Sequence, residues 1–350
     1  MAPKNLPFPL LVACLFFLFA CERETPVYTP IQEPFEWESL PSRMPENSDE
    51  PRFGEVYDFV IDNEDDLWVN TSFLKDGEWA SGAWELDGSQ WAYFRDIEEE
   101  FGDQIKNTSI SNLVFDQQNH IWFGFSQDLL YYNGTEFQAY ALPSPVITDW
   151  RTKVFQMDEQ GRIWLGAENY LASFSNNEWT VYPLPINHEF SFGDLLVTED
   201  AIWLTTNTKL FQIRDGLVTQ ISEVTVELDG GSEEPFFIEL PGDLARDQTG
   251  SIYIATANGL LQWQDDKWKL FNAANSPLEK DYIWDVTIDQ ANQVYVGTEK
   301  GVYLPQLDWK FIPSPSRCAS CSTGIEELKV DRQNRKVALV DGYFYYLKEN

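Results

Sequence analysis

The stretch Asp158–Gly166 reads D-E-Q-G-R-I-W-L-G, and degenerate copies of it recur along almost the whole chain. Asp116–Gly124 and Asp289–Gly297 are the clearest of these copies. The position of the tryptophan in this stretch is aromatic in nearly every copy, and the full set is Trp68, Trp122, Trp164, Trp203, Tyr253, Tyr295 and Ala338. The copies are spaced by roughly 40 to 50 residues, which is the period of β-propeller blades and not of the shorter helical repeats. Seven such positions predict seven blades.

Each repeat has the same internal plan. In the second one, alternating apolar runs at 113–115 and 121–124 flank the aspartate, and further runs follow at 129–132 and 136–140. Runs of this length and alternation are typical of strands. Asn133-Gly134 connects the last two runs, and these residue types tolerate the positive backbone angles of a tight hairpin. The plan therefore predicts a four-stranded antiparallel blade, and the chain is predicted to be all-β.

The last repeat ends after three runs, so its fourth strand must come from another part of the chain. Phe35–Pro41 has the tryptophan, apolar residue and proline of a fourth strand, as in Glu178–Pro183. We predict that this N-terminal strand completes the last blade, which closes the ring and leaves no open sheet edge between the first and last units. Residues 35–350 then form a single propeller domain.

Residues 1–20 carry one lysine and an apolar run that ends in Leu18-Phe19-Ala20-Cys21. This pattern resembles the lipobox of bacterial lipoprotein signal peptides, which implies cleavage before Cys21 and acylation of that cysteine. An ordinary signal peptide is the alternative. Residues 21–34 contain three prolines and are expected to form a tether. Glu22 is not the aspartate of inner-membrane retention, so we expect an outer-membrane lipoprotein, on the periplasmic side or the cell surface, that meets the membrane only through its anchor.

The chain is strongly acidic, with a formal net charge of −33 from 24 basic and 57 acidic residues. Removing the signal peptide removes one lysine, Lys4, and makes the charge −34. A charge of this sign repels phosphate backbones, so nucleic acid is excluded as a partner. A solvated acidic surface, cation binding and attraction to a basic partner remain open.

Two cysteines remain in the body of the protein, Cys318 and Cys321, separated by two residues. In an oxidising compartment we expect them to form a disulfide. The same spacing occurs in redox sites and as half of a zinc site, but the pair lies in an expected loop without a second pair. Disulfide formation is the favoured interpretation. The sequence does not reveal whether the chain binds a metal.

Long connections are predicted on one face of the propeller and short turns on the other. The long ones include 95–109, 142–153, 183–193, 223–242, 272–282 and 314–325, which join blades or link second to third strands. Chain length beyond what closure needs is often retained for binding. Aromatic and charged residues in or next to these connections are candidate ligand contacts that suit stacking on sugars or packing of the loops themselves: Trp79, Trp150, Arg151, His188, Phe190, Phe192, Tyr282 and Trp284.

A second pattern places polar residues at the start of the innermost strands, four residues before the aspartate of each repeat or its Thr198 equivalent. The set is Asp58, Asn112, Asp194, Asp243, Asp285 and Glu327, with Val154 in the third repeat. Innermost strands line the axial channel, so these groups are expected at its mouth. Their oxygens suit a hard cation such as calcium or the hydroxyls of a polyol, or they accept hydrogen bonds from the neighbouring backbone. No other cofactor is expected.

A catalytic constellation is not evident. The chain has only two histidines, and His120 falls in a short turn on the face opposite the long loops. This excludes a histidine metal cluster or a Ser-His-Asp arrangement that uses both. Pairs of carboxylates for glycoside hydrolysis carry no information, because 57 acidic residues always supply some pair at a suitable spacing. We therefore expect a non-catalytic protein.

The D-x-x-G-x-I-W-L-G form of Asp158–Gly166, with its copies at Asp116–Gly124 and Asp289–Gly297, resembles the two-component-regulator propeller repeat. That family builds the periplasmic sensors of hybrid histidine kinases, so the resemblance implies recognition of oligosaccharides. We expect this chain to form one ring without a kinase domain. We expect an envelope protein that binds a glycan or a partner protein. The alternatives are a propeller enzyme acting on polysaccharide, a lyase related to the streptogramin-opening propeller, and a protein-docking scaffold.

Overall fold

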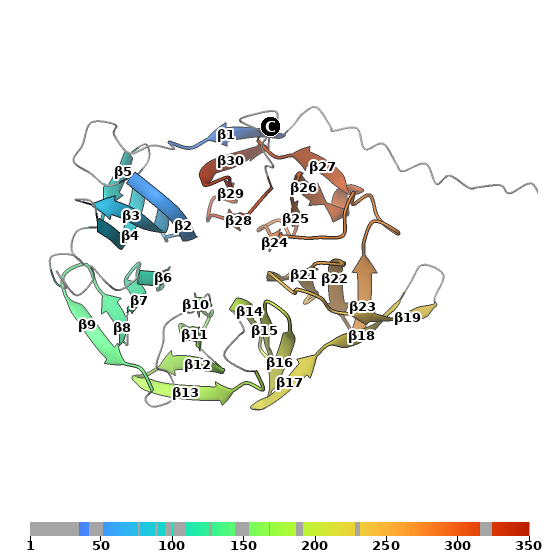
Figure 1. The fold of residues 1–350 in the computed structure, drawn as a ribbon, viewed down its shortest axis with the longest axis horizontal. Helices are drawn as coiled ribbons and strands as arrows, with labels where there is room; N and C mark the ends of the chain where they lie inside the picture. The colour runs from blue at the N-terminus through green and yellow to red at the C-terminus, as the bar shows by residue number, and fades with distance from the viewer. Residues whose placement is uncertain are drawn as a thin grey trace, which may run out of the picture.

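The protein is a seven-bladed β-propeller in the computed structural model (Figure 1). Seven separate sheets, each with four antiparallel strands, surround a central axis, which confirms the predicted blade number and fold class. The structure describes residues 35–41, 52–75, 78–87, 90–94, 100, 110–125, 128–143, 154–167, 169–186, 192–227, 232–315 and 324–349.

Each blade runs outward from the axis in chain order. Blade 1 consists of β2 (Arg52–Ile61), β3 (Leu67–Lys75), β4 (Glu78–Asp87) and β5 (Gln90–Tyr93). Blade 2 consists of β6 (Ile110–Phe115), β7 (Ile121–Phe125), β8 (Asp128–Tyr132) and β9 (Phe137–Ala141). Blade 3 consists of β10 (Phe155–Met157), β11 (Ile163–Ala167), β12 (Tyr170–Ser175) and β13 (Glu178–Pro183). Blade 4 consists of β14 (Phe192–Val197), β15 (Ile202–Thr206), β16 (Leu210–Arg214) and β17 (Leu217–Ile221). Blade 5 is built on β20 (Leu244–Arg246), β21 (Ile252–Thr256), β22 (Gly259–Gln264) and β23 (Lys267–Phe271). Blade 6 consists of β24 (Asp285–Ile288), β25 (Val294–Thr298), β26 (Gly301–Leu304) and β27 (Lys310–Pro313), with the short 3-10 helix η2 (Pro305–Leu307) before its last strand.

Blade 7 joins the two ends of the chain, as predicted. Its first three strands are β28 (Glu327–Val330), β29 (Lys336–Val340) and β30 (Tyr343–Glu349), and β1 (Phe35–Ser39) is the fourth. The β1 strand pairs antiparallel with β30 from Phe35↔Glu349 to Ser39↔Tyr345. The N-terminal strand therefore closes the ring.

Tryptophans in the outermost strands hold neighbouring blades together. The indole N–H of Trp37 in β1 donates to the carbonyl oxygen of Pro313 at the end of blade 6, at 2.8 Å. In the same way Trp91 of blade 1 donates to the carbonyl of Pro41, at 2.7 Å. Trp179 of blade 3 makes the same contact with the Ala141 carbonyl of blade 2, at 3.0 Å, so the tryptophan near the start of several fourth strands has a role in joining blades.

The aspartate of each repeat organises the turn between the first two strands. In blade 3 the Oδ1 atom of Asp158 accepts hydrogen bonds from the backbone N–H groups of Gln160 and Arg162, at 3.0 and 2.9 Å. Its Oδ2 atom accepts from the indole N–H of Trp164 at 2.7 Å. Gly161, between these donors, has a φ of +74°, which favours glycine or asparagine. The spacing of Asp, Gly and Trp in the repeat is therefore the spacing of one capped turn.

The same turns contact one another around the ring. Most of these turns contain one residue with a left-handed backbone conformation. In four turns the side-chain oxygen of that residue accepts a hydrogen bond from a backbone N–H in the turn of the preceding blade, at 2.7 to 3.0 Å. The donor and acceptor pairs are Asn63 with Asn119, Gln248 with Asn292, Gln290 with Asn334, and Arg332 with Asp65. The last pair joins blade 7 to blade 1 and closes the ring on this face.

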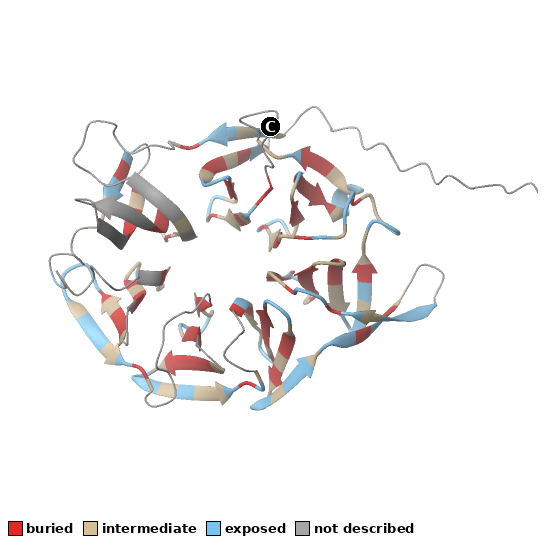
Figure 2. Ribbon diagram, viewed as in Figure 1, coloured by how far each residue is buried: buried red, intermediate tan, exposed pale blue. Residues whose placement is uncertain are grey.

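The hydrophobic core is divided among the faces between blades rather than gathered at one centre. Tyr295 and Val302 of blade 6 pack with Leu328 and Ala338 of blade 7 in one such cluster. Figure 2 shows the buried positions repeating from blade to blade, with the outermost strands largely exposed. Because every blade covers the apolar face of the next, opening the ring at any point exposes two of these faces to water.

Blade 5 differs from its neighbours because it has six strands. A hairpin of β18 (Glu223–Glu227) and β19 (Glu233–Phe237) extends it outward, and β18 pairs in parallel with β23. The interpretation of 223–242 as only a long loop was therefore wrong. The alternating Val224 and Val226 are buried against the blade core, and this pattern could have revealed the strand.

Candidate functional site

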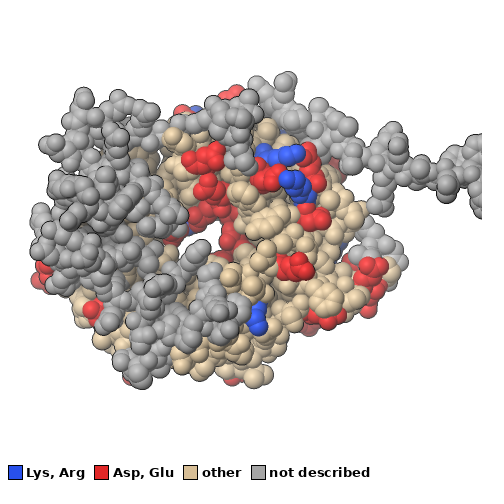
Figure 3. All heavy atoms as spheres, viewed as in Figure 1, with Lys and Arg blue, Asp and Glu red and all other residues tan. Residues whose placement is uncertain are grey.

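The mouth of the axial channel carries the polar side chains that the sequence placed at the start of the innermost strands. Asp58, Asn112 and Asp194 lie within β2, β6 and β14. Asp285 and Glu327 are the first residues of β24 and β28. Figure 3 shows acidic atoms gathered along part of the rim of the central opening. These positions lie at the strand ends opposite the capped aspartate turns, on the long-loop face.

Asp194 is held by donors from three blades. Its Oδ1 atom accepts from the Leu195 N–H at 2.7 Å and from the Gln156 amide of blade 3 at 2.5 Å. Its Oδ2 atom accepts from the Leu244 N–H of blade 5 at 2.9 Å. Burial raises the pKa of Asp194, although these hydrogen bonds act in the opposite direction. This carboxylate is a structural link between blades, as the alternative interpretation of the acidic set proposed.

Lys329 in β28 is a cation of the channel, and sequence reasoning missed it. Its ammonium group donates to Asp58 Oδ1 at 3.0 Å and lies 2.6 Å from a carboxylate oxygen of Glu327. It also donates to the carbonyl of Phe59 and lies 4.7 Å from the centre of that ring. Burial alone would lower the pKa of Lys329, but the carboxylates of Asp58 and Glu327 outweigh it and raise that pKa.

Asp58 and Glu327 are compensated by this lysine. The second oxygen of Asp58 accepts from the Asn112 amide of blade 2 at 3.4 Å. Burial raises the pKa of Glu327 to about 8, although the neighbouring Lys329 opposes the shift. Between a fifth and a third of each of the side chains of Asp58, Glu327 and Lys329 remains exposed. We interpret this exposed surface as facing the narrow channel, because burial is the largest cause of the pKa shifts at Glu327 and Lys329.

Asp243 and Asp285 form a carboxyl pair in blades 5 and 6. Asp285 is 2% exposed, and its Oδ2 atom accepts from the Leu328 N–H of blade 7 at 3.1 Å. Its Oδ1 atom is buried without a donor from the described residues other than a protonated Asp243. Burial raises the pKa of Asp285 to about 7. Burial, followed by the charges of Asp285 and Asp194, raises the pKa of Asp243 well above its usual range.

An aromatic pair stands directly before Asp285 in the chain. Tyr282 is 48% exposed and meets the Trp284 ring edge-on, with 6.5 Å between ring centres. The Trp284 ring packs on Gly324 of the approach to blade 7, where an added Cβ would lie 2.5 Å from the ring. The backbone N–H of Trp284 donates to the Gly297 carbonyl at 2.9 Å. Trp284 is therefore fixed at the channel mouth beside the carboxyl pair, and Tyr282 is open to solvent.

The other candidate residues have different positions. Phe192 is 2% exposed and packs in the core between blades 3 and 4, because Gly166 leaves room for its ring, so it is not kept as a ligand contact. Trp79 lies in the long strand β4, and its side chain is outside the described part of the structure. The remaining predictions fall outside the described residues: Cys21, Trp150, Arg151, His188, Phe190, Cys318 and Cys321.

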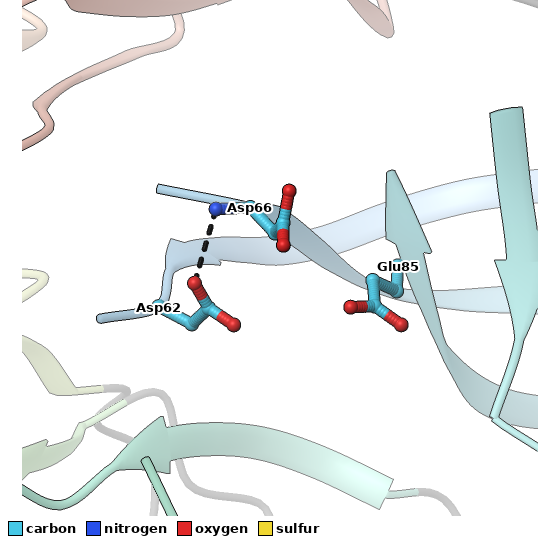
Figure 4. Close-up of side chains that lie close together, drawn as sticks. All are labelled: Asp62, Asp66 and Glu85. Atoms are coloured by element: carbon cyan, nitrogen blue, oxygen red, sulfur yellow. Dashed lines mark hydrogen bonds between the residues drawn. The ribbon is translucent and has the colours of Figure 1, made fainter. Parts of the chain in front are cut away.

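A second group of acids lies on the opposite face, in blade 1. Carboxylate oxygens of Asp62, Asp66 and Glu85 come within 4.8 Å of one another (Figure 4). Asp62 is the capping aspartate of its turn, and it accepts from the Glu64 and Asp66 N–H groups at 2.8 and 3.0 Å. Its other oxygen accepts from the Trp68 indole at 3.2 Å. Both oxygens of Asp62 are thus used by the turn, which distinguishes this group from the channel acids.

Comparison with known proteins gives a fold and no close relative. No protein-family model matches the sequence, and no curated protein matches it. Among solved structures, virginiamycin B lyase from Staphylococcus aureus has a TM-score of 0.61 at 12% identity, covering 91% of this chain and 100% of that chain. The extracellular domain of the putative hybrid two component system BT4673 from B. thetaiotaomicron has a TM-score of 0.58 at 18% identity, covering 89% of this chain and 39% of that chain.

A third similar structure is PorZ, a surface component of the type-IX secretion system of Porphyromonas gingivalis. Its TM-score is 0.62 at 14% identity, and the match covers 87% of this chain and 48% of that chain. Among the described residues, no helix has the length and apolar character needed to cross a membrane. The structural likenesses show that the chain shares its propeller fold with a lyase, an extracellular domain of a putative two component system and a secretion-system component.

The carboxyl groups of the channel predict a fall in stability as the pH rises. Asp285 and Glu327 have ordinary pKa values of 3.8 and 4.5 and folded values of about 7 and about 8. Between these limits the folded state binds more protons than the unfolded state, so the free energy of unfolding decreases with pH. We expect the melting temperature to fall by several degrees, on the order of 2–4 °C per kcal/mol, between pH 5 and pH 8.5.

A pair of substitutions separates this effect from the general repulsion of an acidic protein. Asp285→Asn should flatten the pH dependence measured by differential scanning calorimetry. Asp200→Asn should leave it unchanged, because the Asp200 side chain is 69% exposed in a surface ion pair with Arg214. A melting temperature that rises with pH, or equal slopes in the two variants, would contradict the assignment.

Proposed function

We propose that this protein is a non-catalytic envelope protein that binds a glycan on its long-loop face, at the channel mouth over blades 5 to 7. The observation that carries the proposal is the fixed ring of Trp284 next to the exposed Tyr282 and the carboxyl pair of Asp243 and Asp285. The resemblance of the repeat to sensor propellers that recognise oligosaccharides supports the same ligand class.

The chemistry of this region fits a sugar. A pyranose ring has an apolar face of C–H groups that packs on an aromatic ring, and its hydroxyl edge donates to carboxylates. Packing on Gly324 fixes the Trp284 ring, so little side-chain entropy is lost when a ligand stacks on it. Tyr282 adds a second ring that is already half exposed. Most of the side-chain ordering is therefore complete before the glycan binds.

An enzymatic function has less support in the described residues. The structure of virginiamycin B lyase includes a form made catalytically inactive by replacing one histidine with alanine. In this chain His120 lies in the β6–β7 turn, on the face opposite the channel mouth, and its Nδ1 atom contacts Asp116 and the Tyr131 hydroxyl at 3.2 and 2.7 Å. His188 falls outside the described residues. Lyase activity is the second candidate. A protein partner is the third, because the similar structures include YCF48 bound to a peptide.

The glycan proposal is tested by two equally exposed side chains on opposite faces of the propeller. Tyr282 and Leu307 are each 48% exposed. Tyr282 belongs to the connection into blade 6 on the long-loop face, whereas Leu307 lies in η2, between the third and fourth strands on the short-turn face. Tyr282→Ala should weaken glycan affinity by about tenfold, because loss of a stacked ring is worth about 0.5–1.5 kcal/mol beyond its area. Leu307→Ala should not change it.

The measurement is isothermal titration calorimetry with ligands first identified by melting-temperature shifts across a panel of bacterial and host glycans. No shift with any glycan would overturn the proposal and favour a protein partner. Turnover of a glycan by the protein would favour the enzyme. Equal losses in the Tyr282 and Leu307 variants would show that the site is not at the channel mouth.

We also propose that acylation of Cys21 places the propeller at the outer membrane. The lipobox-like Leu18-Phe19-Ala20-Cys21 supports this location. Cys21→Ala should move the protein from the membrane fraction to the soluble fraction and abolish metabolic labelling with a palmitate analogue. Cys14→Ala is the control within the signal segment and should change neither result. Labelling that persists in the Cys21→Ala variant would contradict the proposal.

A further inference from the structure

The acidic groups of the axial channel differ in whether the protein supplies a donor to them. Asp194 accepts hydrogen bonds from Leu195, Gln156 and Leu244. Asp58 and Glu327 share the ammonium group of Lys329. These three carboxylates are thus compensated by protein groups, which is what burial of a charge requires.

Asp243 and Asp285 are compensated less fully, because the Leu328 N–H that donates to Asp285 Oδ2 is the one backbone donor to this pair among the described residues. The buried Oδ1 atom of Asp285 has no protein donor among the described residues, and the Asp243 side chain that faces it is a second acceptor when ionised. The geometry of the neighbouring blades shows which contact is missing. Asp194 accepts the Leu244 N–H of blade 5, and Asp285 accepts the Leu328 N–H of blade 7.

The equivalent bond from Asp243 would reach the Val286 N–H of blade 6, and no such bond joins these two residues in the described part of the chain. The link between blades 5 and 6 at this level is made by two carboxyl groups instead of a carboxyl group and an amide. Two facing carboxylates repel each other unless a proton or another cation lies between them. Burial is the largest cause of the raised pKa of Asp243, and the charges of Asp285 and Asp194 add to it.

We propose that Asp243 and Asp285 bind one hard divalent cation in the axial channel, with calcium as the ion that fits best. Carboxylate oxygens are the ligands that calcium prefers, and water in the channel can complete its flexible coordination shell. Lys329 does not compete for this position, because its ammonium group is engaged by Asp58, Glu327 and the Phe59 carbonyl. The ion would link blade 5 to blade 6 where the backbone contact is missing.

The blade 1 acids provide a matched control for this proposal. Asp62, Asp66 and Glu85 are also close together, but Asp62 accepts three hydrogen bonds from its own blade, two from the turn and one from the Trp68 indole. They carry the same charge type on the opposite face of the same propeller. A cation that merely responds to acidic surface would bind both groups, whereas a cation bound by the unpaired channel oxygens would bind only one.

The test is calcium titration of the mature protein by isothermal titration calorimetry at pH 8 without any glycan. We expect one saturable site, and Asp243→Asn and Asp285→Asn should each weaken it at least tenfold. The Asp66→Asn and Glu85→Gln double variant should bind as the unaltered protein does. Asp243→Asn is the more secure of the two channel variants, because its side chain accepts no hydrogen bond from the described backbone.

Three results would overturn the cation site. Absence of binding at millimolar calcium would show that a proton occupies the pair. Retention of calcium affinity in both channel variants, or its loss in the blade 1 variant, would place the ion in another part of the molecule. Because no glycan is present, these outcomes are independent of whether the long-loop face binds a sugar.

Discussion

Closure of the ring is the constraint on which the rest of this structure depends. Each blade has two apolar faces, and only another blade covers them, so the core exists only when all seven sheets meet. The closing contacts use residues from opposite ends of the chain. The β1 strand pairs with β30, Trp37 donates to the Pro313 carbonyl, and Arg332 contacts Asp65 across the turn ring. Closure is thus made at the outer edge of blade 7 and at the turns near the axis.

The channel site is a consequence of that closure. Asp58 and Lys329 are 271 positions apart in the chain, and they meet because blades 7 and 1 are neighbours. The same arrangement brings Asp243 of blade 5 against Asp285 of blade 6 in a buried setting where neither has an ordinary pKa. Buried carboxyl groups with raised pKa values are unfavourable for folding at neutral pH. Buried carboxyl groups that lower the stability of the fold are expected mainly at sites that bind a ligand or an ion.

Much of this architecture could be predicted because the repeat records a local structure. In the best-preserved copy the aspartate, the glycine and the tryptophan are the cap, the left-handed residue and the indole donor of one turn, as Asp158, Gly161 and Trp164 show. The closing strand was predictable for a similar reason, since Trp37 repeats a contact made by the other outer strands. A single sequence reveals these features because the two contacting residues either lie in the same repeat or occupy positions that recur from one repeat to the next.

The missed features depend on register between blades. Lys329 gave no signal, because a lysine in a strand acquires a role only when Asp58 lies opposite it. Phe192 was expected to face a ligand, but its ring fills the space that Gly166 leaves in the adjacent blade. The β18–β19 hairpin was hidden within a long connection whose length suggested a loop, although Val224 and Val226 alternate as a strand requires.

The most direct test of ring closure compares two shortened forms of the protein by differential scanning calorimetry. One lacks residues 1–33 and retains β1, and the other lacks residues 1–41 and loses it. If closure stabilises the whole propeller, the form without β1 should melt at least about 10 °C lower and associate through the exposed β30 edge, because several kcal/mol of pairing and burial are lost. Equal melting temperatures and a monomeric state for both forms would contradict the account.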